Sequence, residues 1–362
     1  MQRRDRDQLY RALKTQRQAL DPQHVATLFG LTDEQRVRRI AEELSSYIGV
    51  NLPNAVDQRK GLADYRTNPY VLLTSASILD LADPQPYADF LFNTKLYMAL
   101  ETSFGKSIES AMVGQYPVAA EHKWQDPPEK IEESRDLVGL SNEEKAKRRT
   151  ASVWREIDKS CVVGQRRYVA CIKSGPNCIN DTQVQAMTQA IIDNRREWLA
   201  RTVQTHPGAN RLDVVIGLTY GTDRTTNNKE NQILVKLLER GFVEESRETL
   251  PGVLVDAETR SVRVYRRVGK DFWAFVGNPE DPASAPFVFL EILLALSKAL
   301  SLCKSRMAME DRINLKIQAL ANALGSLRFP RNSLPQWVRQ DFSESELFWF
   351  ATALTGFYDE GI

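Results

Sequence analysis

Segments in which apolar and polar residues alternate with a period of two predict β-strands in the middle of the chain. Arg167–Lys173 alternates in this way, Val153–Ser160 is expected to be its partner strand, and the glycine-containing turn between them predicts a hairpin. Residues 211–220 form an apolar run that predicts a buried strand, and residues 253–255 and 261–267 predict a second hairpin. These segments indicate one sheet built from several short strands.

Apolar residues that recur every three or four positions predict helices around these strands. The clearest segments lie at residues 87–115, 181–203, 231–241 and 286–325. Near the N-terminus, Thr32-Asp33-Glu34-Gln35 fits a capping box with Thr32 as the N-cap. Strands that alternate with helices predict an α/β fold with a mixed sheet flanked by helices, and further helical segments are expected at both ends of the chain.

The pattern divides the chain into three expected parts. Residues 1–66 are predicted to form a helical arm or subdomain, residues 67–300 the central α/β core, and residues 301–362 a helical C-terminal segment. Within the core, residues 117–150 are polar and rich in Pro, Glu and Lys, which is typical of a surface insertion.

Composition narrows the class of protein without naming a function. The chain has 362 residues, of which 42% are hydrophobic and 26% charged, an ordinary balance for a globular protein. Its net charge is +1, so a nucleic-acid surface would have to be a local patch. No apolar run reaches the roughly 18–20 residues of a membrane span, and no apolar signal core stands at the N-terminus. The four cysteines show no zinc-ligand spacing, so we expect reduced thiols and a cytoplasmic protein without a membrane partner.

The first predicted hairpin carries the residues most suited to catalysis. Asp158 lies near the end of its first strand and Lys173 ends its second strand, so pairing could bring them together. A carboxylate can hold Mg²⁺, and the ion lowers the pKa of its bound water. A lysine can orient or deprotonate that water, or stabilise the charge that develops on a phosphate. The pattern fits a metal-dependent nuclease, and equally an exposed strand pair with a surface ion pair.

Several stretches together resemble one enzyme family. The sequences EID and CIKSGPNCIN on the two strands are similar to the PD-(D/E)xK restriction endonucleases, within them the enzymes that cut interrupted GGNCC-type palindromes. NPYVLL before a helix with ETSFGKSIE, the strand IGLTYG, and GKDFWAFVG agree with this resemblance over roughly residues 68 to 300.

This resemblance implies a PD-(D/E)xK-like mixed sheet and a Mg²⁺-dependent type II restriction endonuclease. Such an enzyme would cut double-stranded DNA at a short, GC-rich palindrome. A palindrome is read by a two-fold symmetric homodimer. A DNA methyltransferase protecting the same site would be its functional partner.

The resemblance assigns Asp158 as a metal-binding aspartate and Lys173 as the catalytic lysine, but Cys171 stands where the family usually has Glu or Asp. Mg²⁺ prefers oxygen ligands, so a neutral cysteine is a poor substitute. Glu109 is our first choice for the missing carboxylate and Glu156 the second. Alternatively, the metal keeps more waters, or the protein binds DNA without cutting it. A non-specific repair or transposition-type nuclease of the same fold is a further alternative.

Basic and amide side chains offer candidate DNA contacts. Clustered basic residues can displace counterions from phosphates, and Arg, Lys and Asn can read base edges in the major groove. The polar loop after residue 221 is equally compatible with an ordinary surface turn. The candidates are Lys147, Arg148, Arg149, Arg166, Arg167, Arg224, Asn227, Asn228 and Lys229.

Overall fold

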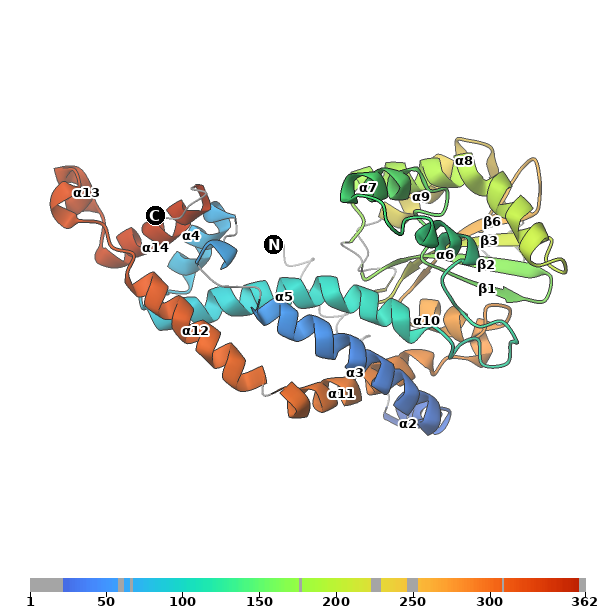
Figure 1. Cartoon of the computed structure of the whole chain (residues 1–362), viewed down its shortest axis with the longest axis horizontal. Coiled ribbons are helices and arrows are strands. Elements are labelled where there is room, and N and C mark those ends of the chain that lie inside the picture. The colour runs from blue at the N-terminus through green and yellow to red at the C-terminus, as the bar shows by residue number, and fades with distance from the viewer. Residues whose placement is uncertain are drawn as a thin grey trace, which may run out of the picture. The chain divides into compact units, whose positions relative to one another are not determined.

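A computed structural model describes residues 22–357 except 58–61, 66–67, 176–177, 223–228, 246–252 and 308. The chain forms two compact units, whose elements are labelled in Figure 1. The sheet unit comprises Ser107–Lys298 and the described part of Met1–Leu44, and the helical unit comprises Ser45–Lys106 and Ala299–Ile362.

The units meet at residues 44/45, 106/107 and 298/299, whereas the expected boundaries are 66/67 and 300/301. The expected boundary at 300/301 lies two residues from the observed one. Each boundary between the units falls inside a long helix, so neither a turn nor a linker marks it in the sequence. The three helices are α3 (Glu34–Asp57), α5 (Pro84–Ala111) and α11 (Val288–Met307).

The sheet unit contains one mixed sheet of six strands in the order β1-β2-β3-β6-β5-β4. β2 and β3 are parallel, as are β3 and β6, whereas the other neighbours are antiparallel. The expected α/β class with a mixed sheet flanked by helices is therefore confirmed. The strands are β1 (Lys159–Val163), β2 (Arg166–Lys173), β3 (Arg211–Leu218), β4 (Phe242–Glu244), β5 (Leu254–Asp256) and β6 (Val262–Val268).

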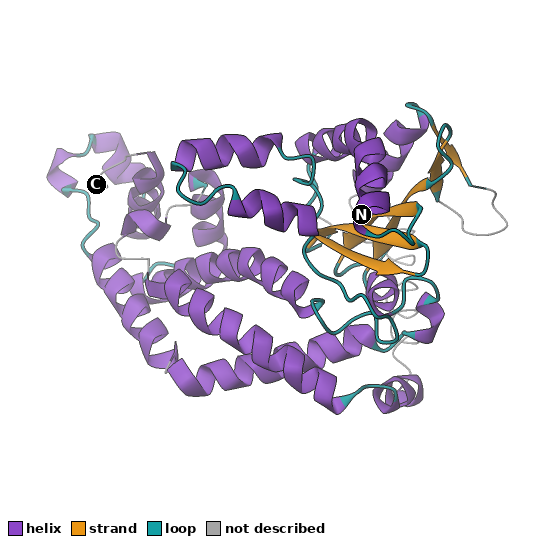
Figure 2. Cartoon of the chain, turned by 45° about the vertical axis from the view of Figure 1, so that its right-hand side comes forward, coloured by secondary structure: helices purple, strands orange, loops and turns teal. Residues whose placement is uncertain are grey.

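Helices cover both faces of this sheet, as the purple and orange elements of Figure 2 show. Cys171 on β2 and Ile216 on β3 share a buried cluster with Met187 of α8 (Asp181–Thr205) and Ile233 of α9 (Lys229–Leu238). On the other face lies α10 (Lys270–Gly277), whose Phe275 ring contacts Tyr168 and Tyr265. The remaining helices of the unit are α2 (Pro22–Gly30), α6 (Pro128–Arg135), α7 (Asn142–Ala151) and the 3₁₀ helix η2 (Pro282–Ser284).

Two of the stretches that carry the family resemblance pack against each other. Gly217 of IGLTYG lies under the Phe272 ring of GKDFWAFVG, and a Cβ at this glycine would be only 2.3 Å from that ring. Trp273 donates its indole N–H to the carbonyl oxygen of Thr219 at 2.8 Å. The two segments therefore form one packing unit at the end of β3.

The first predicted strand is displaced along the chain. Val153–Ser160 was the expectation, but residues 153–156 form a turn and β1 begins at Lys159. Trp154 and Ile157 are buried against α8, and Trp198 donates its indole N–H to the carbonyl oxygen of Val153. The apolar residues of this segment therefore anchor a turn and do not form a strand. The second strand matches its prediction apart from one added residue at its start.

Residues 117–150 are an integral part of the sheet unit, which corrects the expected polar insertion. They contain α6 and α7, and Trp124 is fully buried. Gln125 forms an antiparallel bridge with Ser160 of β1. Glu129 of α6 accepts two hydrogen bonds from the buried guanidinium of Arg167 at 2.7 and 2.8 Å. Few large apolar residues are needed here because a buried ion pair joins α6 to β2.

Of the two helix N-caps considered in the sequence, one differs in the structure and one agrees. The N-cap before α3 is Asp33, whose carboxylate accepts the backbone N–H of Arg36 at 2.7 Å, and not Thr32. Thr32 instead donates its hydroxyl to the carbonyl oxygen of Phe29. Of Asn180 and Asp181, the two N-cap candidates that the sequence offers, Asn180 caps α8 in a capping box with Gln183.

The helical unit has its own core, which includes the buried side chains of Tyr87 and Trp349. Among the described residues, no helix combines the length and the apolar character that a bilayer crossing demands. Besides its parts of α3, α5 and α11, the unit contains η1 (Leu62–Tyr65), α4 (Pro69–Ile78), α12 (Met309–Gly325), η3 (Arg331–Ser333), α13 (Gln336–Asp341), α14 (Glu344–Leu354) and η4 (Thr355–Phe357).

Candidate active site

Asp158 lies immediately before β1 and continues its pairing with β2. Its backbone N–H donates to the carbonyl oxygen of Ala170 at 2.8 Å. Its carboxylate oxygen Oδ2 accepts the backbone N–H of Ile172 at 2.7 Å. This second bond fixes the carboxylate beside the end of β2, one residue before Lys173.

Lys173 ends β2 and is half-buried. The pKa of its ammonium is raised, first by the ionised form of the neighbouring Cys171 and then by the carboxylates of Asp158 and Glu156, while burial opposes the shift. Lys173 is therefore a cation at neutral pH, held in an acidic neighbourhood. The hydrogen bond from Ile172 and the charge of Asp158 acting on Lys173 place both side chains at the same end of β2.

Cys171 is fully buried in the core between the sheet and α8. Burial raises the pKa of its thiol to about 12, so the sulfur is uncharged at neutral pH. A buried neutral thiol lacks the charge and the oxygen chemistry that Mg²⁺ requires. Cys171, which stands where the resembled family usually has an acidic residue, is thus part of the hydrophobic core.

Glu109, on the last turn of α5, lies within electrostatic range of the same residues. Burial and the charge of Asp158 raise the pKa of its carboxyl to about 7, while Lys159, Lys173 and Lys130 act in the opposite direction. Asp158 and Lys173 are therefore near enough to Glu109 for their charges to act on its carboxyl group.

Glu156, the second candidate for the missing carboxylate ligand, lies in the turn between α7 and β1. Its carboxylate lies 3.5 Å from the guanidinium Nε of Arg155, and it also acts on the charge of Lys173. Because the neighbouring Trp154 and Ile157 are buried, this turn holds Glu156 and Asp158 on either side of an anchored residue.

The chemistry of these donors fits a hard divalent cation. Asp158 and Glu109 offer carboxylate oxygens, and their charges repel each other, which a bound cation would relieve. Within the described ranges, no three His, Cys, Asp or Glu side chains form a ready-made ligand group. Mg²⁺ commonly takes only one or two carboxylates and completes its shell with water and substrate phosphates, so two protein ligands suffice.

The candidate DNA contacts fall into different environments. Lys147, Arg148 and Arg149 are exposed on α7. Arg167 is enclosed in its ion pair with Glu129, which removes its guanidinium from any surface contact and corrects that expectation.

Two of the remaining candidates form ion pairs, and the other three lie outside the described residues. Arg166 is half-buried and forms an ion pair with the buried Asp213. Lys229 forms an ion pair with Asp181 at the start of α8. Arg224, Asn227 and Asn228 lie outside the described residues.

Two lysines near the cluster were missed by the sequence reading. Lys130 of α6 donates its ammonium to the carbonyl oxygen of Ile157 at 2.7 Å. Lys159 forms an ion pair with Asp126. Both act on the charge of Glu109. Lys130 lies in the segment interpreted as an insertion, where no local pattern marks it.

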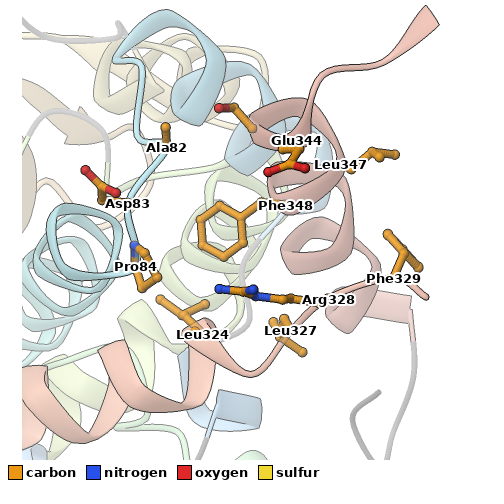
Figure 3. A pocket seen from close by; sticks show the side chains of 12 residues that line it. Ala82, Asp83, Pro84, Leu324, Leu327, Arg328, Phe329, Glu344, Leu347 and Phe348 are labelled. Atoms are coloured by element: carbon orange, nitrogen blue, oxygen red, sulfur yellow. The ribbon is translucent and has the colours of Figure 1, made fainter. Parts of the chain in front are cut away.

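A separate pocket of about 490 Å³ lies in the helical unit. Figure 3 shows the ring of Phe348 and the guanidinium of Arg328 among apolar side chains that include Leu324 and Leu327. None of the residues nominated for catalysis lines it, so it is distinct from the candidate active site.

Comparison with known proteins found no match that bears on this site. No family model matches the chain, and no curated protein matches it. The candidate active site, formed by Asp158, Lys173 and Glu109, therefore rests on its residues and their arrangement.

Proposed function

We propose that this protein is a Mg²⁺-dependent endonuclease that hydrolyses phosphodiester bonds in double-stranded DNA. The observation that carries the proposal is the hydrogen bond from Ile172 N–H to the Asp158 carboxylate, which holds that group beside Lys173 with Glu109 in electrostatic range. The mixed sheet, and the packing between IGLTYG and GKDFWAFVG, add support from the stretches that resemble PD-(D/E)xK restriction endonucleases.

The resemblance extends the proposal to a type II restriction endonuclease. It would act as a homodimer with one active site for each strand of a short, GC-rich palindrome. A methyltransferase that modifies the same site would protect the host DNA.

Asp158 and Glu109 would hold the metal ion. When bound, Mg²⁺ would lower the pKa of a coordinated water and offset negative charge on the scissile phosphate. The hydrogen bond from Ile172 N–H leaves the second carboxylate oxygen of Asp158 for the cation and keeps the side chain oriented.

Lys173 would act through its charge. Its raised pKa keeps the ammonium protonated at neutral pH, so it is suited to stabilising charge on the phosphate oxygens and to orienting water by donating a hydrogen bond. Proton abstraction by this side chain would first require the ammonium to lose its proton.

Incubation of the protein with Mg²⁺ and plasmid DNA tests the proposal. Discrete fragments are the expected result, and Asp158→Asn and Lys173→Met should abolish cutting while retaining DNA binding. Lys298→Ala, which removes an exposed lysine on α11, is the matched control and should cut normally. Normal cutting by either site variant would refute the assignment, and a smear would indicate a non-specific nuclease.

The position of Cys171 favours one other function, a DNA-binding protein whose catalytic site has decayed. A neutral buried thiol replaces the usual acidic residue. Binding of DNA without cutting in Mg²⁺ or Mn²⁺ would support this alternative, and cutting gained by Cys171→Glu would identify the lost ligand.

A further inference from the structure

A groove of about 470 Å³ lies between α6, α7 and the turn that leads to β1. We call it the α6–α7 groove. Four basic side chains and two acidic ones line it, namely Lys130, Arg148, Arg149, Arg155, Glu133 and Asp136. Its excess of positive charge contrasts with the near-neutral charge of the whole chain.

The acidic residues of the groove do not neutralise its arginines. The Glu133 carboxylate accepts the hydroxyl of Ser152. No ion pair within 4.0 Å joins Arg148 or Arg149 to an acidic side chain of the described residues. Both guanidinium groups stand exposed on α7 and are available to an anionic ligand.

The α6–α7 groove borders the turn that carries Glu156 and leads to Asp158. Lys130 lines the groove, and its ammonium binds the carbonyl oxygen of Ile157, the residue before Asp158. Arg155 lines the groove, and its guanidinium lies 3.5 Å from the carboxylate of Glu156. The groove therefore lies next to the chain segment that carries Glu156 and Asp158.

We infer that the α6–α7 groove binds the sugar-phosphate backbone of the DNA strand that enters the active site. This inference rests on the proposed nuclease function. A guanidinium group binds phosphate oxygens through paired hydrogen bonds, and two neighbouring arginines can contact successive phosphates. Backbone contacts of this kind position a strand without reading its sequence.

Binding measurements with single-arginine variants test the inference. Fluorescence anisotropy of labelled duplexes of two unrelated sequences, in EDTA to prevent cutting, gives the affinity at several salt concentrations. Arg149→Ala should weaken binding of both duplexes by about tenfold at 0.1 M salt and reduce the slope of log K against log salt by about 0.9. Arg148→Ala/Arg149→Ala should roughly double the change in slope.

Arg211→Ala is the matched control. Arg211 is an exposed arginine at the start of β3, whereas Lys173 pairs with Leu218 at the other end of that strand. Its removal should leave the slope unchanged. Equal behaviour of Arg149→Ala and Arg211→Ala would overturn the groove assignment, while cutting by the wild type would leave the nuclease proposal intact. Absence of DNA binding by the wild type would overturn both.

Discussion

Two glutamates near β2 differ in how their charges are compensated. At the start of the strand, Glu129 is paired with the buried Arg167 through two hydrogen bonds. Burial alone would raise the pKa of Glu129, but the hydrogen bonds and charge of Arg167 outweigh it and lower the pKa. At the other end, burial and then the charge of Asp158 raise the pKa of Glu109 to about 7.

The comparison distinguishes a structural ion pair, in which both charges are compensated, from a site in which the negative charge of a buried carboxylate is poorly compensated. A buried pair with matched hydrogen bonds needs nothing further, and its role is to join α6 to β2. Two nearby carboxylates repel each other, and a bound cation would relieve this repulsion. Residues with pKa values perturbed in this way are concentrated at functional sites. The same residue type therefore serves architecture at one end of the strand and candidate chemistry at the other.

Removal of Arg167 should have the largest effect. Arg167→Met would leave Glu129 largely buried without its partner, which should lower the free energy of unfolding by about 3–5 kcal/mol. Urea unfolding measures the change. The double variant Arg167→Met/Glu129→Leu should recover most of the loss, because no unpaired charge remains. A single variant as stable as the wild type would contradict a structural role for the pair.

Removal of the Glu109 charge should affect activity and spare stability. Glu109→Gln would delete a proposed metal ligand and reduce the cutting rate by about 100-fold, equivalent to about 2.7 kcal/mol in the barrier. The rate of plasmid linearisation at saturating Mg²⁺ measures it. Glu132→Gln, an exposed position on α6, is the control. An unchanged rate for Glu109→Gln would exclude this carboxylate from the site.

The pKa of Glu109 also predicts a pH dependence of stability. Between its ordinary value of 4.5 and about 7, the folded state keeps a proton that the unfolded chain has released. Stability from this group should therefore fall as pH rises through that window and level off above it. Melting temperatures in EDTA should show this decline for the wild type and a smaller one for Glu109→Gln. Identical profiles would count against the raised pKa.

Cys171 should show the smallest effect. Because its thiol is buried and neutral, Cys171→Ala should change the cutting rate in Mg²⁺ by no more than about twofold. The free energy of unfolding should fall by about 1 kcal/mol, as for other small losses of core volume. A large loss of activity with preserved stability would show that the sulfur takes part in the chemistry.

The sequence predicted those parts of the fold that depend on local pattern. The buried strand β3, the second hairpin of β5 and β6, and the Asn180 cap of α8 all follow from period, turn chemistry or capping. The boundaries of the two units could not be predicted in this way, because each lies within a continuous helix.

The candidate site was predictable where the residues are close in sequence or match a family pattern. Asp158 and Lys173 are close in sequence, at the two strands of one predicted hairpin. Because Cys171 stands where an acidic ligand is expected, Glu109 was predicted to supply the missing carboxylate. The pairing of Glu129 with Arg167 joins residues 38 positions apart and has no local signature. The start of β1 was misplaced because the apolar residues Trp154 and Ile157 anchor a turn against α8 instead of lying in a strand.

The bridge between Gln125 and Ser160 has a consequence for self-association. β1 is an edge of the sheet, and an open edge invites pairing with a strand from another molecule. Gln125 occupies both backbone groups of Ser160 that face away from β2, at 3.0 and 2.8 Å. A second copy of the chain could not extend the sheet across this position without displacing the bridge, so the proposed homodimer would have to meet through another surface.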